Sequence, residues 1–352
     1  MSGSRLHLAI GGVFAVTAVA GTLHYADAKP VLVFVAAALA LMGLAWTVGV
    51  GTESVGARFG PSVTGVLQST LGNLPELFIV LFALHAGEVV LAQTSILGSL
   101  FANALLVLGL AIVAGARQSG DGVMRFHRRL PNDTATLLLL AIFIIVLLGL
   151  SDNVGDRASH HQVAISSIGA VLLLSVYAVW LFSYLRSPHG SEPTLEGRHA
   201  VLSFGRALVL LALAGVGAAL VSDWFVSALD PAVKSLGISK AFTGLVIVAI
   251  AGNAVENVVG VTLAAKGQAD LAISVVKNSV AQIAVFLFPV LVLLSLFFAD
   301  RLTFVVNPIY IGALFLMAIA VWQITGDGEA MAFEGWALVA LYAVLGVLTW
   351  FE

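Results

Sequence analysis

Two glutamates occupy matching positions in two similar apolar stretches of the chain. The first stretch reads GNLPELFIVLFALHAGEVVLA and the second reads GNAVENVVGVTLAAKGQADLA. At a constant offset of 180 residues the shared polar motif consists of Gly72, Asn73 and Glu76 in the first copy and Gly252, Asn253 and Glu256 in the second. A carboxylate inside a bilayer costs several kcal/mol, so its presence there indicates function.

The residues around these glutamates suit a hard cation. Glycine before each glutamate weakens the helix, and Pro75 removes a backbone donor, so carbonyl oxygens should be freed beside each carboxylate. Calcium takes about six to eight oxygens from carboxylates, carbonyls, amides and water. Asparagines on the motif and amides on the following spans could complete the shell. The predicted ligands are Glu76, Glu256, Asn73, Asn253, Gly72, Gly252, Asn103 and Gln282.

The same two glutamates predict coupling to protons. Without a cation, loss of hydration and mutual repulsion favour their protonated forms, whereas a divalent cation favours the ionised pair. Cation and proton then compete for Glu76 and Glu256, which is the minimum requirement for exchange. No nucleophile–base pair or metal triad is found at membrane depth, so we do not expect an enzyme, and no cofactor is expected beyond the transported cation and protons.

The composition requires that these motifs sit in a polytopic membrane protein. Apolar residues make up 60% of the chain and charged residues 10%, with a mean hydropathy of +1.06. A soluble domain needs more charge than this, and the net charge of −3 does not suggest nucleic acid. The chain has no cysteine, which excludes disulfides and thiolate metal sites. A spanning helix needs roughly 20 apolar residues. We predict eleven spans: 6–23, 31–51, 61–86, 89–115, 133–150, 161–186, 203–223, 237–265, 268–298, 303–325 and 333–351.

The repeat divides these spans into two groups of five. Because five is odd, the second group enters the membrane with opposite polarity, which is the inverted-repeat plan of many secondary transporters. The fold class is therefore all-α, with two inverted five-helix repeats and an additional N-terminal helix. The predicted divisions are 1–30 for that helix, 31–186 for the first repeat, 187–202 for a cytoplasmic linker and 203–352 for the second repeat.

The distribution of Lys and Arg predicts the orientation. Most basic residues fall on one set of loop ends, including Arg117, Arg125, Arg128 and Arg129 in the connection 116–132. Since Lys and Arg favour cytoplasmic loops, the N-terminus is expected in the cytoplasm and the C-terminus outside. The short N-terminus favours a prokaryotic plasma membrane. Expected partners are inorganic cations, protons and the lipid bilayer, and homo-oligomerisation stays open.

At both motifs the chain resembles the calcium/proton exchanger family of the cation/calcium exchanger superfamily. The resemblance extends from GPSVTGVLQSTLGNLPELFIVLFALHAGE into SILGSLFANALLVLGL, and from GLVIVAIAGNAVENVVGVTLAAKGQADLAI into SVAQIAVFLFPVLVL. It covers nearly all of the chain from about residue 45. The resemblance implies eleven spans, two cavities that meet at the glutamates, and calcium exported against protons.

Three positions depart from the family pattern and are candidate modulators. Asn257 replaces a histidine that the family usually has after the second glutamate, so proton handling should rest on the glutamates. Gln68 replaces an asparagine before the first motif, and its amide reaches one methylene further. Lys277 stands where the family usually has a small apolar residue. It could extend toward the interface or pair with Asp270, or it could lie near Glu256 and favour a monovalent cation.

Other polar residues leave further alternatives. Glu53 could assist at the cytoplasmic entrance or pair with Arg58, while His85 and Glu88 are interpreted as solvated helix ends. The alternative function is a sodium, or other monovalent cation, proton antiporter. A channel would need a continuous pore, and paired glutamates in inverted repeats favour a closed-off site instead.

Overall fold

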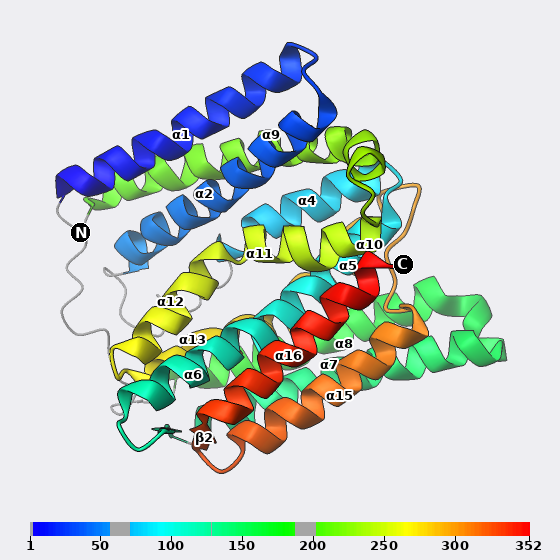
Figure 1. The fold of residues 1–352 in the computed structure, drawn as a ribbon. Coiled ribbons are helices and arrows are strands. Elements are labelled where there is room, and N and C mark those ends of the chain that lie inside the picture. The colour runs from blue at the N-terminus through cyan, green and yellow to red at the C-terminus, as the bar shows by residue number, and fades with distance from the viewer. Residues whose placement is uncertain (1–2, 57–70, 128, 187–201) are drawn as a thin grey trace. The chain divides into compact units, whose positions relative to one another are not determined.

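The computed structural model describes residues 3–56, 71–127, 129–186 and 202–352 (Figure 1). Within these ranges, the side chains of residues 3–4, 56, 129–132, 184–186 and 254–256 lie outside the described part. Gln68, Arg58 and the predicted linker 187–202, apart from its last residue, also lie outside it.

The described part of the chain is almost entirely helical, with three π-helical turns inside its longer helices. The first half contains α1 (Gly3–Tyr25), α2 (Pro30–Gly56), α4 (Leu74–His85), α5 (Val89–Phe101), η1 (Ala102–Val107), α6 (Leu108–Gln118), β1 (Val123–Arg125), α7 (Arg129–Val154), η2 (Arg157–His161) and α8 (Gln162–Arg186). The second half contains α9 (Phe204–Leu236), α10 (Lys240–Phe242), η3 (Thr243–Val248), α11 (Ala249–Gly252), α12 (Ala254–Ala265), α13 (Ala269–Gln282), η4 (Ile283–Leu287), α14 (Phe288–Ser295), α15 (Pro308–Thr325), β2 (Glu329–Met331) and α16 (Ala332–Trp350).

Most of these helices are long and apolar enough to cross a bilayer. Within the described residues, nine continuous helices meet the length and hydropathy of a span, and the broken helix from Lys240 to Ala265 is a tenth candidate. Helix α4 is apolar but has only 12 residues, and the predicted span 61–86 begins in residues outside the description. A membrane-embedded helical fold is confirmed, and the count of eleven spans stays a prediction.

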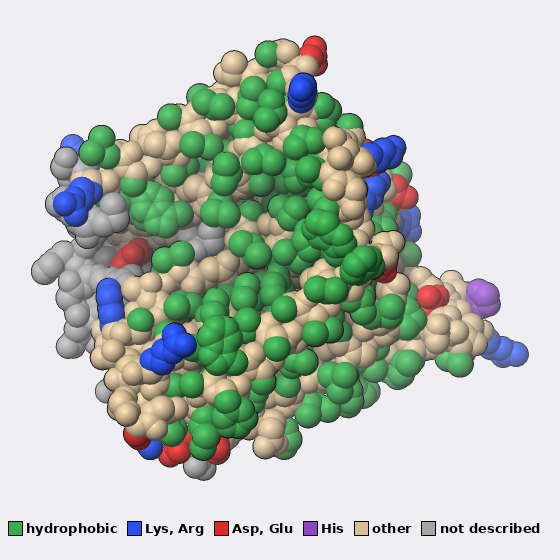
Figure 2. Space-filling view, in the orientation of Figure 1, with side chains coloured by type: hydrophobic (Ala, Val, Ile, Leu, Met, Phe, Trp, Pro, Cys, Tyr) green, Lys and Arg blue, Asp and Glu red, His purple; other side chains and the backbone are tan. Residues whose placement is uncertain are grey.

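Apolar side chains cover the outside of the helices as well as their packed interior. Phe143, Trp322 and Val344 are exposed on α7, α15 and α16. Figure 2 shows hydrophobic side chains along the helices, with most Lys, Arg, Asp and Glu gathered near helix ends and connections. Exposure of so many apolar side chains to water would be unfavourable, whereas the same side chains are expected on a surface that faces lipid.

The helices form two compact units, each of which takes segments from both halves of the chain. The first unit comprises residues 1–95, 188–255 and 350–352, and the second comprises residues 96–187 and 256–349. The predicted division into repeats therefore describes the order of the chain rather than its compact units, and that division stays a prediction.

In the first unit, α2 and α9 pack against each other along with α1, and α4 packs on α9. Helix α11 contacts both α2 and α4, which brings the second Gly-Asn motif to the first. Small residues permit the close packing of α2 on α9: a Cβ at Gly51 of α2 would lie 2.8 Å from Leu211 of α9. Close approach through small residues is typical of helices packed in membranes.

In the second unit, α13 packs against α7 and against η1, while α14 packs against α8. Helix α16 meets α6 at two glycines, where a Cβ on Gly109 would lie 2.5 Å from the carbonyl oxygen of Gly335. The backbones therefore touch at a point where any side chain would force the helices apart.

A two-stranded ribbon, which the sequence did not predict, joins two connections of the second unit. Strands β1 and β2 are antiparallel, with Arg125 opposite Glu329. Arg125 also forms an ion pair of 2.7 Å with Asp121. The connection after α6 and the connection after α15 therefore lie at the same end of this unit, as the predicted topology requires. The orientation of that end in the membrane stays a prediction.

Candidate cation-binding site

Both Gly-Asn motifs interrupt helices, as the sequence predicted. Asn73 has φ −83° and ψ 5° just before α4 begins, and Asn253 has φ −94° and ψ 23° between α11 and α12. Both conformations fall near the sparsely populated bridge region, where active-site residues are often found. The two interruptions are 180 positions apart, so they match the sequence repeat at the level of the backbone.

Glu76 is buried beside the interruption of the other repeat. It is the third residue of α4, its side chain is only 2% exposed, and its Oε1 accepts a hydrogen bond of 2.5 Å from Nδ2 of Asn253. The N-terminal end of a helix favours a negative charge in its first turn. The helix end and the asparagine amide thus offset part of the hydration that burial removes, which makes an ionised Glu76 tenable inside the membrane.

The asparagine is oriented by a second bond. Nδ2 of Asn253 also donates to the carbonyl oxygen of Ala249 at 2.9 Å. Since both amide hydrogens face protein acceptors, the carbonyl oxygen of Asn253 is the side-chain atom that could ligate a cation. Asn73, on the opposite motif, is also buried, with 4% of its surface exposed.

Glycine at position 252 is a steric requirement of this contact. A Cβ built there would lie 2.7 Å from Cγ of Glu76 and 3.0 Å from its Oε1. Contacts below 3 Å are repulsive, so the carboxylate can lie against α11 only because residue 252 has no side chain. This gives Gly252 a role in shaping the site, besides the carbonyl ligand proposed from sequence.

The second glutamate has the same position in its helix. Glu256 is the third residue of α12, just as Glu76 is the third residue of α4. Its side chain lies outside the described part of the structure, so its predicted role as a ligand stays a prediction. One turn later, Gly260 packs closely on Val276 of α13 in the second unit.

The predicted amide ligands Asn103 and Gln282 lie in the second unit, at two π-helical turns. Asn103 is fully buried in η1 and donates from Nδ2 to Oγ of Ser279 at 3.2 Å. Gln282 directly precedes η4, and its Oε1 is buried with no hydrogen-bond partner among the described atoms. π-Helical turns are rare and concentrate at functional sites. The Asn103–Ser279 contact was not predicted from the sequence.

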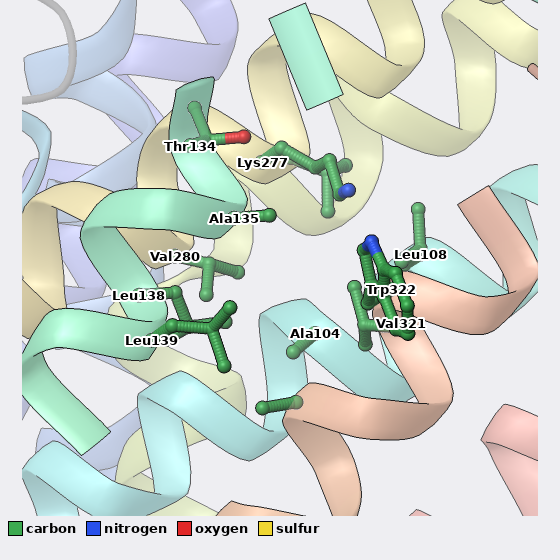
Figure 3. A pocket seen from close by; sticks show the side chains of 12 residues that line it. Ala104, Leu108, Thr134, Ala135, Leu138, Leu139, Lys277, Val280, Val321 and Trp322 are labelled. Carbon is green, nitrogen blue, oxygen red and sulfur yellow. The ribbon is translucent and has the colours of Figure 1, made fainter. Parts of the chain in front are cut away.

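Lys277 points toward the end of a neighbouring helix. Its Nζ donates to Oγ1 of Thr325 at 2.6 Å, and that hydroxyl donates in turn to the carbonyl oxygen of Val321. Figure 3 shows Lys277 in a pocket with Thr134, Val321 and Trp322. Thr325 ends α15, and a helix C-terminus favours a positive charge.

This direction separates the lysine from the Asn103–Ser279 contact. Residues 277 and 279 are about 200° apart around α13, so their side chains leave opposite sides of the helix. The lysine extends toward the C-terminal end of α15 and is buried, with 5% of its surface exposed. Its predicted extension to the membrane interface stays a prediction. Asp270, the partner suggested from sequence, instead accepts a hydrogen bond of 2.7 Å from the backbone N–H of His127. An effect of Lys277 on cation preference stays a prediction.

One interpretation of the sequence was wrong, and others are untested. Glu88 is not a solvated helix end, because its side chain is 17% exposed and both carboxylate oxygens bind Nζ of Lys240. A partner 152 residues away could not be found from local pattern. His85 is exposed, as expected. Glu53 and Asn257 are half-buried on α2 and α12, and the structure tests neither proposed role.

Within the described residues, no group of three or more His, Cys, Asp or Glu side chains could hold a metal ion. The site instead offers one described carboxylate with amides and interrupted helix ends. Such a set suits a cation that binds and leaves, since a tight site would hinder release.

Comparison with known proteins agrees with this architecture. The family model for the sodium/calcium exchanger protein matches residues 29–185 and 206–351. A Ca²⁺/H⁺ antiporter from Synechocystis is 31% identical, over 94% of this chain and 93% of its own. A Ca²⁺/H⁺ antiporter from Bacillus subtilis is 30% identical, over 92% of this chain and 93% of its own.

Solved structures show the same fold. The structure of native YfkE superposes with a TM-score of 0.81 at 25% identity and covers 98% of this chain and 99% of its own. The crystal structure of the H⁺/Ca²⁺ exchanger CAX gives a TM-score of 0.71 at 13% identity and covers 99% of this chain and 94% of its own. The chain therefore belongs to the sodium/calcium exchanger family, in its calcium/proton exchanger branch.

Proposed function

We propose that this chain is a secondary-active antiporter that exports calcium in exchange for protons by alternating access. The observation that carries the proposal is the buried Glu76, held at the start of a half-helix by Asn253 of the other motif. The names of its relatives, which include Ca²⁺/H⁺ antiporters from two bacteria, support calcium as the cation.

The proposed exchange uses Glu76 in two states. Ionised, its carboxylate binds calcium together with the carbonyl oxygen of Asn253 and backbone carbonyls near Gly252. Protonated, it loses its negative charge and no longer attracts the cation, so calcium is released. The hydrogen bond from Asn253 holds the side chain in place through both states. Glu256, third in its own helix, would supply the second charge.

The inverted repeats support alternating access. Interrupted helices at the repeat interface are where such transporters bind their ions, and related repeats can exchange roles between an inward-open and an outward-open state. We further propose that the protein lies in a prokaryotic plasma membrane with its N-terminus in the cytoplasm, as the bias of Lys and Arg indicates.

Reconstitution into proteoliposomes with an imposed pH gradient tests this function. We expect the gradient to drive calcium movement in the wild-type protein and expect at least a tenfold loss in Glu76→Gln and in Glu256→Gln. Glu329→Gln, which changes an exposed glutamate of the ribbon, is the matched control and should exchange normally. Sodium, potassium and manganese are measured in parallel.

Two results would overturn the proposal in different ways. Sodium movement without calcium movement would favour the monovalent-cation antiporter instead. Calcium movement that does not depend on the imposed pH gradient would exclude exchange of calcium for protons.

A further inference from the structure

One ammonium group joins three segments of the first unit at one membrane face. Nζ of Lys240, at the start of α10, binds Oε1 and Oε2 of Glu88 at 2.8 and 2.7 Å. It also lies 2.6 Å from Oδ1 of Asp230, on α9. Glu88 lies in the connection between α4 and α5, so this cluster ties the far end of α4 to α9 and to the start of α10. We call Lys240, Glu88 and Asp230 the clasp.

The clasp and the cation site lie at opposite ends of the same two segments. Glu88 follows Glu76 by 12 residues, and Lys240 precedes Gly252 by 12 residues. At about 1.5 Å per helical residue, each interval spans roughly 18 Å. The two segments run in opposite directions and touch at both ends, through Lys240 and Glu88 at the face and through Gly252 and Glu76 at the site.

Packing is also tight along the segment that runs from the clasp to the cation site. A Cβ at Gly244, one turn after Lys240, would lie 2.1 Å from Oγ1 of Thr94 and 2.8 Å from the backbone nitrogen of Ser95. The segment that starts at Lys240 is therefore packed onto α5 with no space for a side chain. The same glycine lies in the π-helical turn η3, and such turns are rare and frequently found at functional sites.

We propose that the clasp is a gate of the transporter: it closes the route from its own membrane face to Glu76, and it opens once in each exchange cycle. In the predicted topology this face is the outer one. The inference rests on the proposed antiport function. Because the Lys240 side chain is 35% exposed, water can replace its partners as they part, so the contact can be broken and remade.

The charges of the clasp explain how the gate can be closed by ion pairs and still open reversibly. Two carboxylates share one ammonium, and Asp230 is more exposed than Glu88, at 45% against 17%. Glu88, the more buried partner, would hold the end of α4 against the start of α10 in the closed state. When Glu88 moves away, Asp230 would keep the charge of Lys240 paired. A gate of this kind needs no large difference in free energy between its two states.

A labelling experiment tests the gate without relying on transport. The chain contains no cysteine, so a single cysteine can be introduced without background. Ala83→Cys places a buried thiol on α4 between Glu76 and Glu88. A membrane-impermeant maleimide is added on each side in turn, and His85→Cys, at the exposed last residue of α4, identifies the face of the clasp.

We expect Lys240→Met to speed labelling of the Ala83→Cys thiol from that face at least tenfold. The Ala37→Cys thiol, buried in α2, is the control for general loosening and should stay protected in the same background. Glu88→Gln should act in the same direction as Lys240→Met. The proposal that the clasp is a gate would be wrong if the labelling rate of the Ala83→Cys thiol were unchanged in both variants. It would also be wrong if the labelling rate of the Ala37→Cys thiol rose equally.

Cross-linking then tests whether the clasp must open during exchange. Glu88→Cys/Lys240→Cys is treated with a short reducible bis-methanethiosulfonate. The control is Arg125→Cys/Glu329→Cys, which replaces an opposite-charge pair already fixed by the β1–β2 ribbon. We expect the clasp cross-link to lower exchange at least tenfold, with recovery on reduction, while calcium still raises the thermal stability of the cross-linked protein.

The outcomes distinguish this inference from the proposed function. Full exchange by the cross-linked clasp variant would overturn the gate and leave antiport standing. Wild-type protein that moves no calcium would overturn the function alone, since the labelling result still decides whether the clasp closes its face.

Discussion

Replacing Gly252 with alanine tests the contact between the two motifs more directly than removal of a charge. The added methyl group would lie 2.7 Å from Cγ of Glu76 and 3.3 Å from its Cδ. Carbon atoms in contact prefer about 3.5–4.0 Å, so the glutamate would have to retreat by roughly 1 Å. Charge, hydrogen-bonding groups and hydropathy are otherwise unchanged.

A displacement of that size should be costly for a site that depends on placement. Functional groups must be held within about 0.5 Å of their productive positions, and a misplacement of about 1 Å can lower a rate roughly 100-fold. We therefore expect Gly252→Ala to lower gradient-driven calcium exchange by about 10- to 100-fold. Alanine is favoured over glycine in helices by about 0.5–1 kcal/mol, so the fold should be retained.

The assay compares Gly252→Ala with Gly215→Ala in proteoliposomes. Gly215 lies on α9 of the same unit, and a Cβ there meets nothing within 4 Å. Both variants carry the same chemical change, but only the first should lose exchange. Wild-type exchange and an unchanged apparent KM for calcium in folded Gly252→Ala would refute the role assigned to this contact.

Two further predictions concern the second unit. Thr325→Val removes the hydroxyl that accepts a hydrogen bond of 2.6 Å from Nζ of Lys277, beside a pocket lined mainly by apolar side chains. We expect a loss of about 1–3 kcal/mol, measured as a lower melting temperature in detergent, whereas Thr325→Ser should melt near the wild type. Equal melting of both variants would contradict this reasoning. At the ribbon, the hydrogen bond from Arg125 lowers the pKa of Asp121 from 3.8 to about 2. The stabilising contribution of Asp121 is therefore present above about pH 3.8 and is lost as the pH falls toward 2, and Arg125→Gln should return the pKa of Asp121 toward 3.8 in an NMR titration. An unchanged titration would show that Arg125 is not the cause.

Composition and repetition in the sequence already determined the class of protein and the positions at which two of its helices are interrupted. Long apolar runs require a membrane because lipid is their favourable solvent, and the repeated Gly-Asn…Glu pattern indicated where helices break. These are local properties, since a helix is interrupted by its own residues. The structure confirms both interruptions, at Asn73 and Asn253.

Contacts between distant segments could be decided only by the tertiary structure. The bond from Asn253 to Glu76, the pairing of Asn103 with Ser279 and the ribbon between β1 and β2 join residues 176 or more positions apart. Such pairs depend on which helix faces pack together, and no periodicity within one helix encodes that choice.

The same reason explains the error at Glu88 and the open question at Lys277. Read locally, Glu88 follows an apolar helix and resembles an ordinary solvated end. Packing of α10 against the α4–α5 connection brings Lys240 to it, and the end of α15 brings Thr325 to Lys277. Burial makes these charged groups depend on their partners, and only the packed helices determine which partners those are.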